Sequence, residues 1–211
     1  MYEDELVSVV IPTLDRAELL LTRSIPSVMA QGHQNWRLLV VGDGATPEVE
    51  AAMATVTDPR VSFTNRPQQF YPTDGFWKWN VIGADAINYG LDQISDGWCS
   101  TLGDDDELMP DFMDHLLGLA LQRDWDMVYG RSEVVGHGFL GNGQPACGSQ
   151  TNSMLWRISE IRQDPESYKQ RLPADWVLMR DIIASGVPWG FSGATVHRYY
   201  PAHSIPGTSP S

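Results

Sequence analysis

The chain has 211 residues, of which 42% are hydrophobic and 19% charged, a composition typical of a globular protein with its own core. Its formal net charge of −13 argues against nucleic-acid binding, which depends on Lys and Arg side chains that neutralise phosphates. No apolar run approaches the ~20 residues that a membrane-spanning helix needs, so no transmembrane segment is predicted.

The amino terminus is acidic and lacks a basic region followed by an apolar one. No signal peptide is therefore predicted, and the expected location is cytoplasmic. The two cysteines, Cys99 and Cys147, are far apart and fit no metal-ligand spacing, which favours buried free thiols. Nothing in the sequence indicates an oligomeric state.

The first 130 residues alternate between strand patterns and helix patterns joined by short connections. The expected strands are 6–11, 37–41, 61–64, 98–102 and 127–129. The expected helices are 16–31 with a kink or restart at Pro26, one opened by Thr46 and Pro47, 80–91, and 110–123. This alternation predicts a doubly wound α/β sheet.

The pattern changes after Gly130. Five glycines between residues 136 and 148 predict a mobile loop. A helix is expected over 174–185 and a hydrophobic segment over 189–200. Residues 204–211 contain two prolines and a glycine and are expected to form a flexible tail.

Polar clusters follow three of the predicted strands, at 12–16, 42–44 and 103–107. Ligands of open α/β sheets bind outside the carboxyl ends of parallel strands, so these clusters are candidates for one site. The third cluster contains Asp104, Asp105 and Asp106, whose carboxylates suit Mg²⁺ or Mn²⁺. Acidic residues ahead of a helix also interact favourably with its dipole, and this alternative stays open. Three adjacent like charges repel one another, however, and a bound cation explains the third.

The motifs that carry these clusters resemble, in order and spacing, those of glycosyltransferase family 2 over about residues 6–130 and more loosely to 200. They are VSVVIPT at 7–13 with Arg16, Gln31, VVGDGAT at 40–46, NYG at 88–90 and LGDDDELMP at 102–110. The resemblance implies a GT-A fold, a Rossmann-like doubly wound mixed sheet flanked by helices with a small acceptor-side lobe. It also implies one domain over 1–203, in which 6–130 bind the nucleotide sugar and 131–203 supply the acceptor side and the catalytic base.

The same resemblance implies a metal-dependent, inverting transfer of a sugar from a nucleoside-diphosphate sugar, most often of UDP. The acceptor would be a hydroxyl of a carbohydrate or glycoconjugate, and polysaccharide or glycoconjugate synthesis would be the setting. Carried over by position, Pro12, Thr13 and Arg16 line the nucleoside pocket. Asp43 accepts a hydrogen bond from the base, although a turn residue flanked by glycines has the same sequence pattern.

For the metal, the resemblance implies Mn²⁺ or Mg²⁺ on the donor diphosphate. Gly103 stands where the family often has its first Asp, so Asp106 pairs with Asp104, or with Asp105 in a shifted register. Asp104 and Asp105 are also expected to contact the donor. The family commonly has Arg where this chain has Ile87, and Lys78 and Arg66 are the nearest basic candidates for the diphosphate.

The catalytic base is expected at Asp175, in the segment ADWVLMR at 174–180, which resembles the family's Glu-Asp motif with Ala174 in place of Glu. Inverting transfer requires a carboxylate within reach of the acceptor hydroxyl. An ordinary acid at a helix N-terminus is the alternative for this residue.

Several further residues are candidates by position. The resemblance implies that His197 contacts the metal or diphosphate, although a packed histidine fits equally well. Trp156 and Trp176 are acceptor-side candidates, and Trp77 and Trp79 could stack on a sugar or pack in the core. The remaining histidines are expected at the surface: His33, His115, His137 and His203.

Two other functions fit parts of the sequence. Ala174 and Ile87 leave room for a catalytically degenerate domain that binds a nucleotide sugar or glycan. A nucleotidyltransferase shares the layout but usually has a glycine-rich loop after the first strand, and residues 11–16 contain no glycine. The same absence excludes a dinucleotide-binding dehydrogenase.

Overall fold

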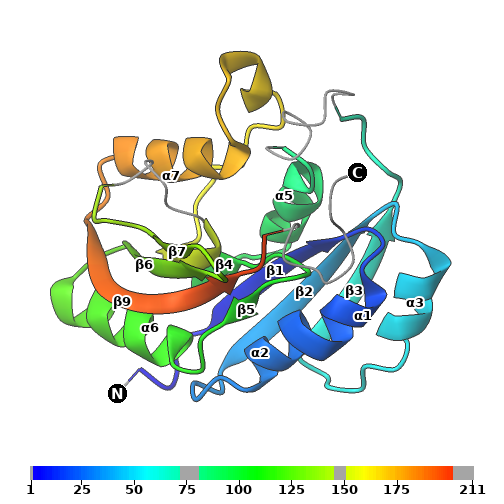
Figure 1. Ribbon diagram of the computed structural model, residues 1–211. Coiled ribbons are helices and arrows are strands. Elements are labelled where there is room, and N and C mark those ends of the chain that lie inside the picture. The colour runs from blue at the N-terminus through cyan, green and yellow to red at the C-terminus, as the bar shows by residue number, and fades with distance from the viewer. Residues whose placement is uncertain (1, 72–80, 145–150, 202–211) are drawn as a thin grey trace.

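A computed structural model describes residues 2–71, 81–144 and 151–201 (Figure 1). The strands of this part of the chain are β1 (Val7–Thr13), β2 (Trp36–Asp43), β3 (Val61–Arg66), β4 (Trp98–Thr101), β5 (Glu107–Leu108), β6 (Met127–Val134), β7 (Gly138–Leu140), β8 (Met154–Arg157) and β9 (Trp189–Tyr199). They form one sheet in the order β3-β2-β1-β4-β8-β6-β9-β5, with β7 paired to β6.

The longer helices are α3 (Pro47–Met53), α5 (Ala84–Asp92), α6 (Phe112–Arg123) and α7 (Ala174–Ala184). A helical stretch after β1 consists of α1 (Ala17–Leu19), the π-helical segment η1 (Leu20–Ser24) and α2 (Ile25–Met29). Two short 3₁₀ turns are η2 (Thr151–Ser153) and η3 (Ser167–Gln170). Within the described residues, none of the helices combines the length and the apolar character that crossing a bilayer requires.

The sheet has a parallel half and a mixed half. β3, β2, β1 and β4 run parallel, so the carboxyl ends of these strands lie at one edge. β8 runs antiparallel to both of its neighbours, β4 and β6, and β9 runs parallel to β6. The predicted α/β sheet with helices on both sides is confirmed, and the second half of the chain extends the same sheet.

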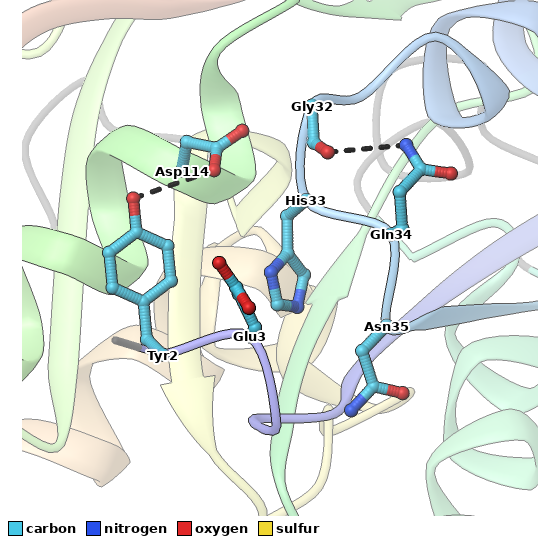
Figure 2. Close-up of a pocket in the computed structure, with 7 residues that line it drawn as sticks. All are labelled: Tyr2, Glu3, Gly32, His33, Gln34, Asn35 and Asp114. Carbon is cyan, nitrogen blue, oxygen red and sulfur yellow. Dashed lines mark hydrogen bonds between the residues drawn. The ribbon is translucent and has the colours of Figure 1, made fainter.

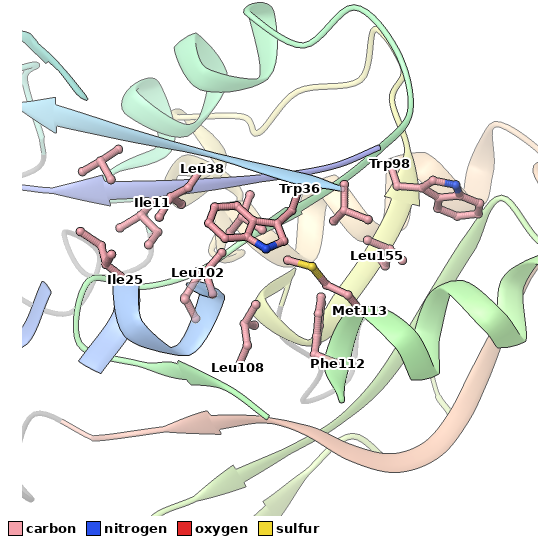
Figure 3. Close-up of a cluster of buried hydrophobic side chains, with 14 of the residues drawn as sticks. Ile11, Ile25, Trp36, Leu38, Trp98, Leu102, Leu108, Phe112, Met113 and Leu155 are labelled. Atoms are coloured by element: carbon pink, nitrogen blue, oxygen red, sulfur yellow. The ribbon is translucent and has the colours of Figure 1, made fainter. Parts of the chain in front are cut away.

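Hydrophobic side chains cover both faces of the sheet. On one face Val7, Val9 and Ile11 of β1 pack with α2, α3 and α6 in a cluster that also holds Trp36 and Trp98 (Figure 3). On the other face, β1 contributes Val10 to a second cluster with residues of α5 and α7. Because alternate residues of one strand serve two cores, β1 has to be largely apolar, and Val7, Val9, Val10 and Ile11 meet this requirement.

Where a kink or restart is expected at Pro26, the helix changes type: the π-helical segment η1 ends two residues before the proline, which stands at the start of α2. Proline has no backbone N–H and cannot bond the carbonyl four residues earlier. A wider helical turn accommodates this loss without ending the helix. At α3 the expected start is confirmed, with Thr46 at the N-cap and Pro47 at the first position.

Three features differ from the sequence prediction. The segment after Gly130 continues as β6 and turns back as β7, so the predicted loop begins with a hairpin. The strands β5 and β8 were not predicted. Residues 145–150, Trp77, Lys78, Trp79, His203 and the predicted tail lie outside the described residues.

The histidines also differ from expectation. His33 is 4% exposed, and its Nε2 atom lies 2.8 Å from the backbone oxygen of Glu5, so the surface prediction for it is wrong. His115 is half-buried, with its Nε2 atom shielded from solvent, and the prediction is wrong there too. His137 is exposed, as expected.

The packing of α5 on β1 predicts a large difference between two helical glycines. A Cβ atom at Gly90 of α5 would lie 2.4 Å from Val10 Cγ1, whereas at Gly118 of α6 the nearest atom would be Tyr2 Cε1 at 3.4 Å. Gly90→Ala should therefore lower the free energy of unfolding by about 1–3 kcal/mol through overpacking. Gly118→Ala should be neutral or raise it by up to about 1 kcal/mol, since Ala favours helix. Urea unfolding of both variants tests this, and equal effects would contradict the packing described.

Candidate active site

Two of the predicted polar clusters meet at the ends of β1 and β4. Thr13 donates its hydroxyl hydrogen to Asp104 Oδ2 at 2.9 Å. Arg16 Nη1 donates to Asp104 Oδ1 at 3.1 Å and to Asp105 Oδ2 at 2.7 Å. The contacts follow from topology, because β1 and β4 are adjacent parallel strands and their ends share one edge.

The helical stretch after β1 holds the backbone of this acidic turn. Arg23 Nη1 donates to the carbonyl oxygen of Asp105 at 2.6 Å, and Ser24 donates its hydroxyl hydrogen to the carbonyl oxygen of Gly103 at 3.0 Å. These two residues were not among the sequence candidates. A polar residue on the inner side of a helix is the only sequence signal for them, and it does not identify a partner.

Asp106 is the most constrained carboxylate of the triplet, with 2% of its surface exposed. Its Oδ1 accepts the backbone N–H of Tyr200 at 3.0 Å. Its Oδ2 accepts a hydrogen from Asn152 Nδ2 at 3.1 Å and lies 3.4 Å from His197 Nε2. Two segments far along the chain, at 152 and at 197–200, therefore converge on one side chain.

His197 lies on β9, fully buried, with its Nδ1 atom 2.9 Å from the Ser132 hydroxyl. Its Nε2 atom faces Asp106 and has no hydrogen-bond partner. A buried ring nitrogen aimed at a carboxylate, with its other nitrogen oriented by a hydroxyl, is the arrangement of a metal-ligating histidine. The residues present thus fit a divalent cation.

Within residues 2–71, 81–144 and 151–201, no group of three or more His, Cys, Asp or Glu side chains is arranged to hold a metal alone. Mg²⁺ usually takes one or two protein carboxylates and completes its shell with substrate phosphate oxygens and water.

The crowding of carboxylates changes their acidity. Burial raises the pKa of Asp105 to about 7, assisted by the charges of Asp106 and Asp104 and opposed by that of Arg16. Burial also raises the pKa of Asp104, against the charge of Arg16 and the hydrogen bonds from Thr13 and Arg16. The turn therefore carries more negative charge than Arg16 alone offsets.

Asp175 lies in the first turn of α7, where its Oδ1 accepts the N–H of Trp176 at 2.9 Å. Burial raises its pKa to about 6, while backbone N–H groups, including that of Thr151, lower it. Thr151 belongs to η2, whose next residue, Asn152, donates to Asp106. The short turn η2 therefore connects the candidate base with the acidic turn.

Tyr199 interacts electrostatically with both the acidic turn and Asp175. Burial is the largest cause that raises the pKa of Tyr199. The negative charges of Asp106 and Asp105 raise it further, and so does that of Asp175. One phenol lies within electrostatic range of all three carboxylates. Tyr199 therefore lies near both the acidic turn and Asp175.

Asp43, at the end of β2, is 5% exposed and already bonded. Its Oδ1 accepts the N–H of Gln69 at 3.0 Å, and its Oδ2 accepts the hydroxyl hydrogen of Tyr71. Pro12 borders the same region through Gly83, whose N–H donates to the Tyr71 hydroxyl. A Cβ atom on Gly83 would lie 3.0 Å from Pro12 Cβ. The second polar cluster is thus next to the first.

Arg66 is the described candidate for a basic residue near the diphosphate. Its guanidinium carbon lies 4.3 Å from the ring centre of Tyr89, and Nη1 donates to the backbone oxygen of Asp85 at 3.4 Å. Burial raises the pKa of Asp85, and the negative charge of Asp43 raises it further, whereas the positive charge of Arg66 lowers it. Arg66 thus borders the Asp43 region. Ile87 lies on α5, is buried and packs in the core.

The acceptor-side interpretation of Trp156 is wrong. The side chain is 1% exposed on β8 and belongs to the core between β4 and β6. Its ring packs with apolar residues and has no face available to a sugar. Trp176 is half-buried near the start of α7, beside Asp175, and remains a candidate.

A hollow of about 490 Å³ lies at the other end of the sheet (Figure 2). Its walls include Tyr2, His33 and Asp114, with the Tyr2 hydroxyl 3.5 Å from Asp114 Oδ1. These residues precede the amino ends of β1 and β2 or lie on α6. The hollow is therefore remote from the strand ends that carry the polar clusters.

The known proteins that this chain resembles are glycosyl transferases. The profile described as "Glycosyl transferase family 2" matches residues 8–186. The putative colanic acid biosynthesis glycosyl transferase WcaA of Escherichia coli K12 is 23% identical over 218 residues, covering 92% of this chain and 72% of that protein. The Escherichia coli UDP-Glc:alpha-D-GlcNAc-diphosphoundecaprenol beta-1,3-glucosyltransferase WfgD is 25% identical over 133 residues, covering 63% of this chain and 48% of that protein.

Solved structures with the same fold include Staphylococcus aureus TarS 1-349 in complex with UDP-GlcNAc, with a TM-score of 0.72 at 11% identity. The mannosyltransferase PcManGT from Pyrobaculum calidifontis, in complex with GDP-Man and Mn²⁺, has a TM-score of 0.64 at 11% identity. This chain is covered to 92% and 95% respectively, but it spans only 58% of each of those chains. The likeness shows a GT-A fold.

The raised pKa of Asp105 predicts a pH-dependent stability. A carboxyl group that binds its proton more tightly in the folded state makes folding less favourable as pH rises through 4 to 7. Asp105→Asn removes this cost, so its free energy of unfolding should exceed that of the wild type by about 1–3 kcal/mol at pH 8 and match it near pH 4. Exposed Asp124→Asn is the control and should change neither value. Urea unfolding without divalent cations measures both, and a variant less stable at pH 8 would contradict the prediction.

Proposed function

Because this chain belongs to glycosyl transferase family 2, we propose that it transfers a sugar from a UDP-sugar to a hydroxyl of a carbohydrate or glycoconjugate, with inversion at the anomeric carbon. The observation that carries the proposal is the convergence of Thr13, Arg16, Asp104 and Asp105 at one sheet edge. The match to WcaA and WfgD, whose names specify colanic acid synthesis and glucosyl transfer from UDP-Glc, supports polysaccharide or glycoconjugate synthesis.

In this proposal residues 6–130 bind the donor. Pro12 and Thr13 line the nucleoside pocket, and Asp43 accepts a hydrogen from the base. Arg16 binds in the same region, where its guanidinium now bonds two carboxylates. Arg66 supports the nucleotide side of the pocket, and Lys78 is proposed from sequence alone.

Asp106, Asp104 or Asp105, and His197 are the proposed holders of Mn²⁺ or Mg²⁺. The orphaned Nε2 atom of His197 supports this assignment, since an unpaired buried nitrogen is costly unless a ligand satisfies it. When bound, such a cation neutralises negative charge on the diphosphate. The complex of PcManGT with GDP-Man and Mn²⁺ is consistent with a cation in a protein of this fold.

Asp175 is the proposed catalytic base. The acceptor hydroxyl oxygen attacks the anomeric carbon, its proton passes to the Asp175 carboxylate, and the bond to the diphosphate oxygen breaks. The electron pair of that bond leaves on the diphosphate. A pKa of about 6 suits this role, because the group is ionised at neutral pH and still basic enough to accept a proton. Trp176 is proposed to contact the acceptor.

The second candidate function is a domain that binds a nucleotide sugar without catalysis. Ala174, which stands where the family usually has Glu, is 2% exposed and packs with Val81 and Ala84. No carboxylate is available at that position. Donor binding by the wild type without transfer or donor hydrolysis over a broad acceptor panel would favour this function.

Replacing the proposed base separates catalysis from binding. Asp175→Asn keeps the size of the side chain but cannot accept the proton, so kcat should fall about 10²–10⁴-fold with UDP affinity unchanged. Asp181→Asn, on the exposed side of the same helix, should retain activity. The wild-type kcat/KM should rise as pH increases through about 6. Steady-state kinetics with calorimetric UDP binding measures these quantities, and near-normal kcat in Asp175→Asn would refute the assignment.

Removing divalent cations tests the metal separately. With a chelator, UDP should bind at least about tenfold more weakly, and Mn²⁺ should restore both affinity and turnover, since the cation links protein carboxylates to phosphate. Asp106→Asn keeps hydrogen-bonding atoms at the site but should lose this response to Mn²⁺. Asp111→Asn, at the N-cap of α6, is the control. Calorimetry of UDP with and without Mn²⁺ is the measurement, and a full response in Asp106→Asn would exclude Asp106 as a ligand.

A further inference from the structure

The hydrogen bonds of Asp43 bear on which nucleobase the chain can accept, an inference that depends on the proposed function. Each carboxylate oxygen already has one donor inside the protein, Gln69 N–H on Oδ1 and the Tyr71 hydroxyl on Oδ2. Asp43 is 5% exposed, so few other groups can approach it. The number of acceptor positions left for a ligand is therefore small.

Tyr71 is fixed in place and its hydroxyl keeps its proton. The hydroxyl oxygen accepts the N–H of Gly83 at 3.1 Å while its hydrogen is donated to Asp43. The ring packs against the small cluster of Val81, Ala84 and Ala174. Burial raises the pKa of Tyr71, as does the hydrogen bond to Asp43, so the group is a donor at any physiological pH.

The nucleobases differ in what they need from a carboxylate. Guanine presents two adjacent donors, its ring N–H and its amino group, which a carboxylate satisfies with both oxygens. Uracil presents one ring N–H between two carbonyl oxygens and needs a single acceptor. A hydroxyl donor held on Oδ2 competes with the second hydrogen of guanine and does not affect the single hydrogen of uracil.

We propose that Tyr71 sets the nucleobase specificity of the donor site, restricting Asp43 to a base with one ring N–H, such as uracil. Gln69 contributes its backbone N–H, which substitutions other than proline leave in place. The Tyr71 hydroxyl is thus the part of this arrangement that evolution or mutagenesis can change. It acts on the ligand through Asp43 and is a specificity-determining residue.

The test compares UDP and GDP, which differ only in the base. Calorimetry with Mn²⁺ should show that the wild type binds UDP more tightly than GDP. In Tyr71→Phe the ratio of the two dissociation constants should fall about tenfold or more, chiefly because GDP binds better once Oδ2 is available. Tyr168→Phe is the matched control, since Tyr168 packs against the same cluster, and it should keep the wild-type ratio. Urea unfolding verifies that both variants are folded.

The possible failures are distinguishable. The role of Tyr71 would be overturned if the wild type bound GDP more tightly than UDP. It would also be overturned if Tyr71→Phe left the ratio of the two dissociation constants unchanged, including by weakening the binding of both nucleotides equally. Either result would leave the proposed donor binding intact. A wild type that binds neither UDP nor GDP, with or without Mn²⁺, would overturn the proposed function itself.

Discussion

The burial of Asp106 is the constraint on which the arrangement of the site depends. A carboxylate excluded from water is costly unless hydrogen bonds replace its hydration. The replacement comes from the backbone of Tyr200 and the amide of Asn152, with His197 nearby. These groups reach Asp106 only if β9 and η2 are docked against the turn after β4. The electrostatic requirement of one side chain therefore joins the two halves of the chain.

The same docking determines where the candidate base lies. η2 is attached to the end of β4 through the Thr101 hydroxyl, which lies 3.0 Å from the Thr151 hydroxyl and 3.2 Å from Asn152 Oδ1. The backbone N–H of Thr151 interacts with Asp175 at the start of α7. A base has to be held within a fraction of an ångström of its productive position to be effective. A three-residue turn bonded at both ends supplies such rigidity at a low cost in ordered chain.

The parts predicted from sequence are those in which local pattern and tertiary environment agree. β1 and β2 each contain a continuous apolar run that serves both faces, residues 9–11 and 38–41, so composition suffices to identify them. β5 has two residues and β8 has four, too short for a period to be visible. Trp156 was assigned to the acceptor side because an aromatic residue fits both a sugar platform and a core, and only the packing of β8 between two strands decides. The roles of Asn152 and Tyr71 depend on contacts across 46 and 28 residues of sequence, which no local pattern encodes.

Charge balance connects the fold with the ligand that it is suited to bind. Arg16 forms ion pairs with Asp104 and Asp105, while Arg23 contacts the backbone oxygen of Asp105. When all three carboxylates of the turn are ionised, their charge exceeds that of Arg16 by two. The raised pKa of Asp105 is the response of the protein alone, since protonation removes one of these charges. A divalent cation removes both without protonation, and its remaining coordination positions accept phosphate oxygens. An acidic chain with net charge −13 would otherwise repel an anionic donor. If the site holds a diphosphate as proposed, the charge of the acidic turn predicts that its affinity depends on the cation.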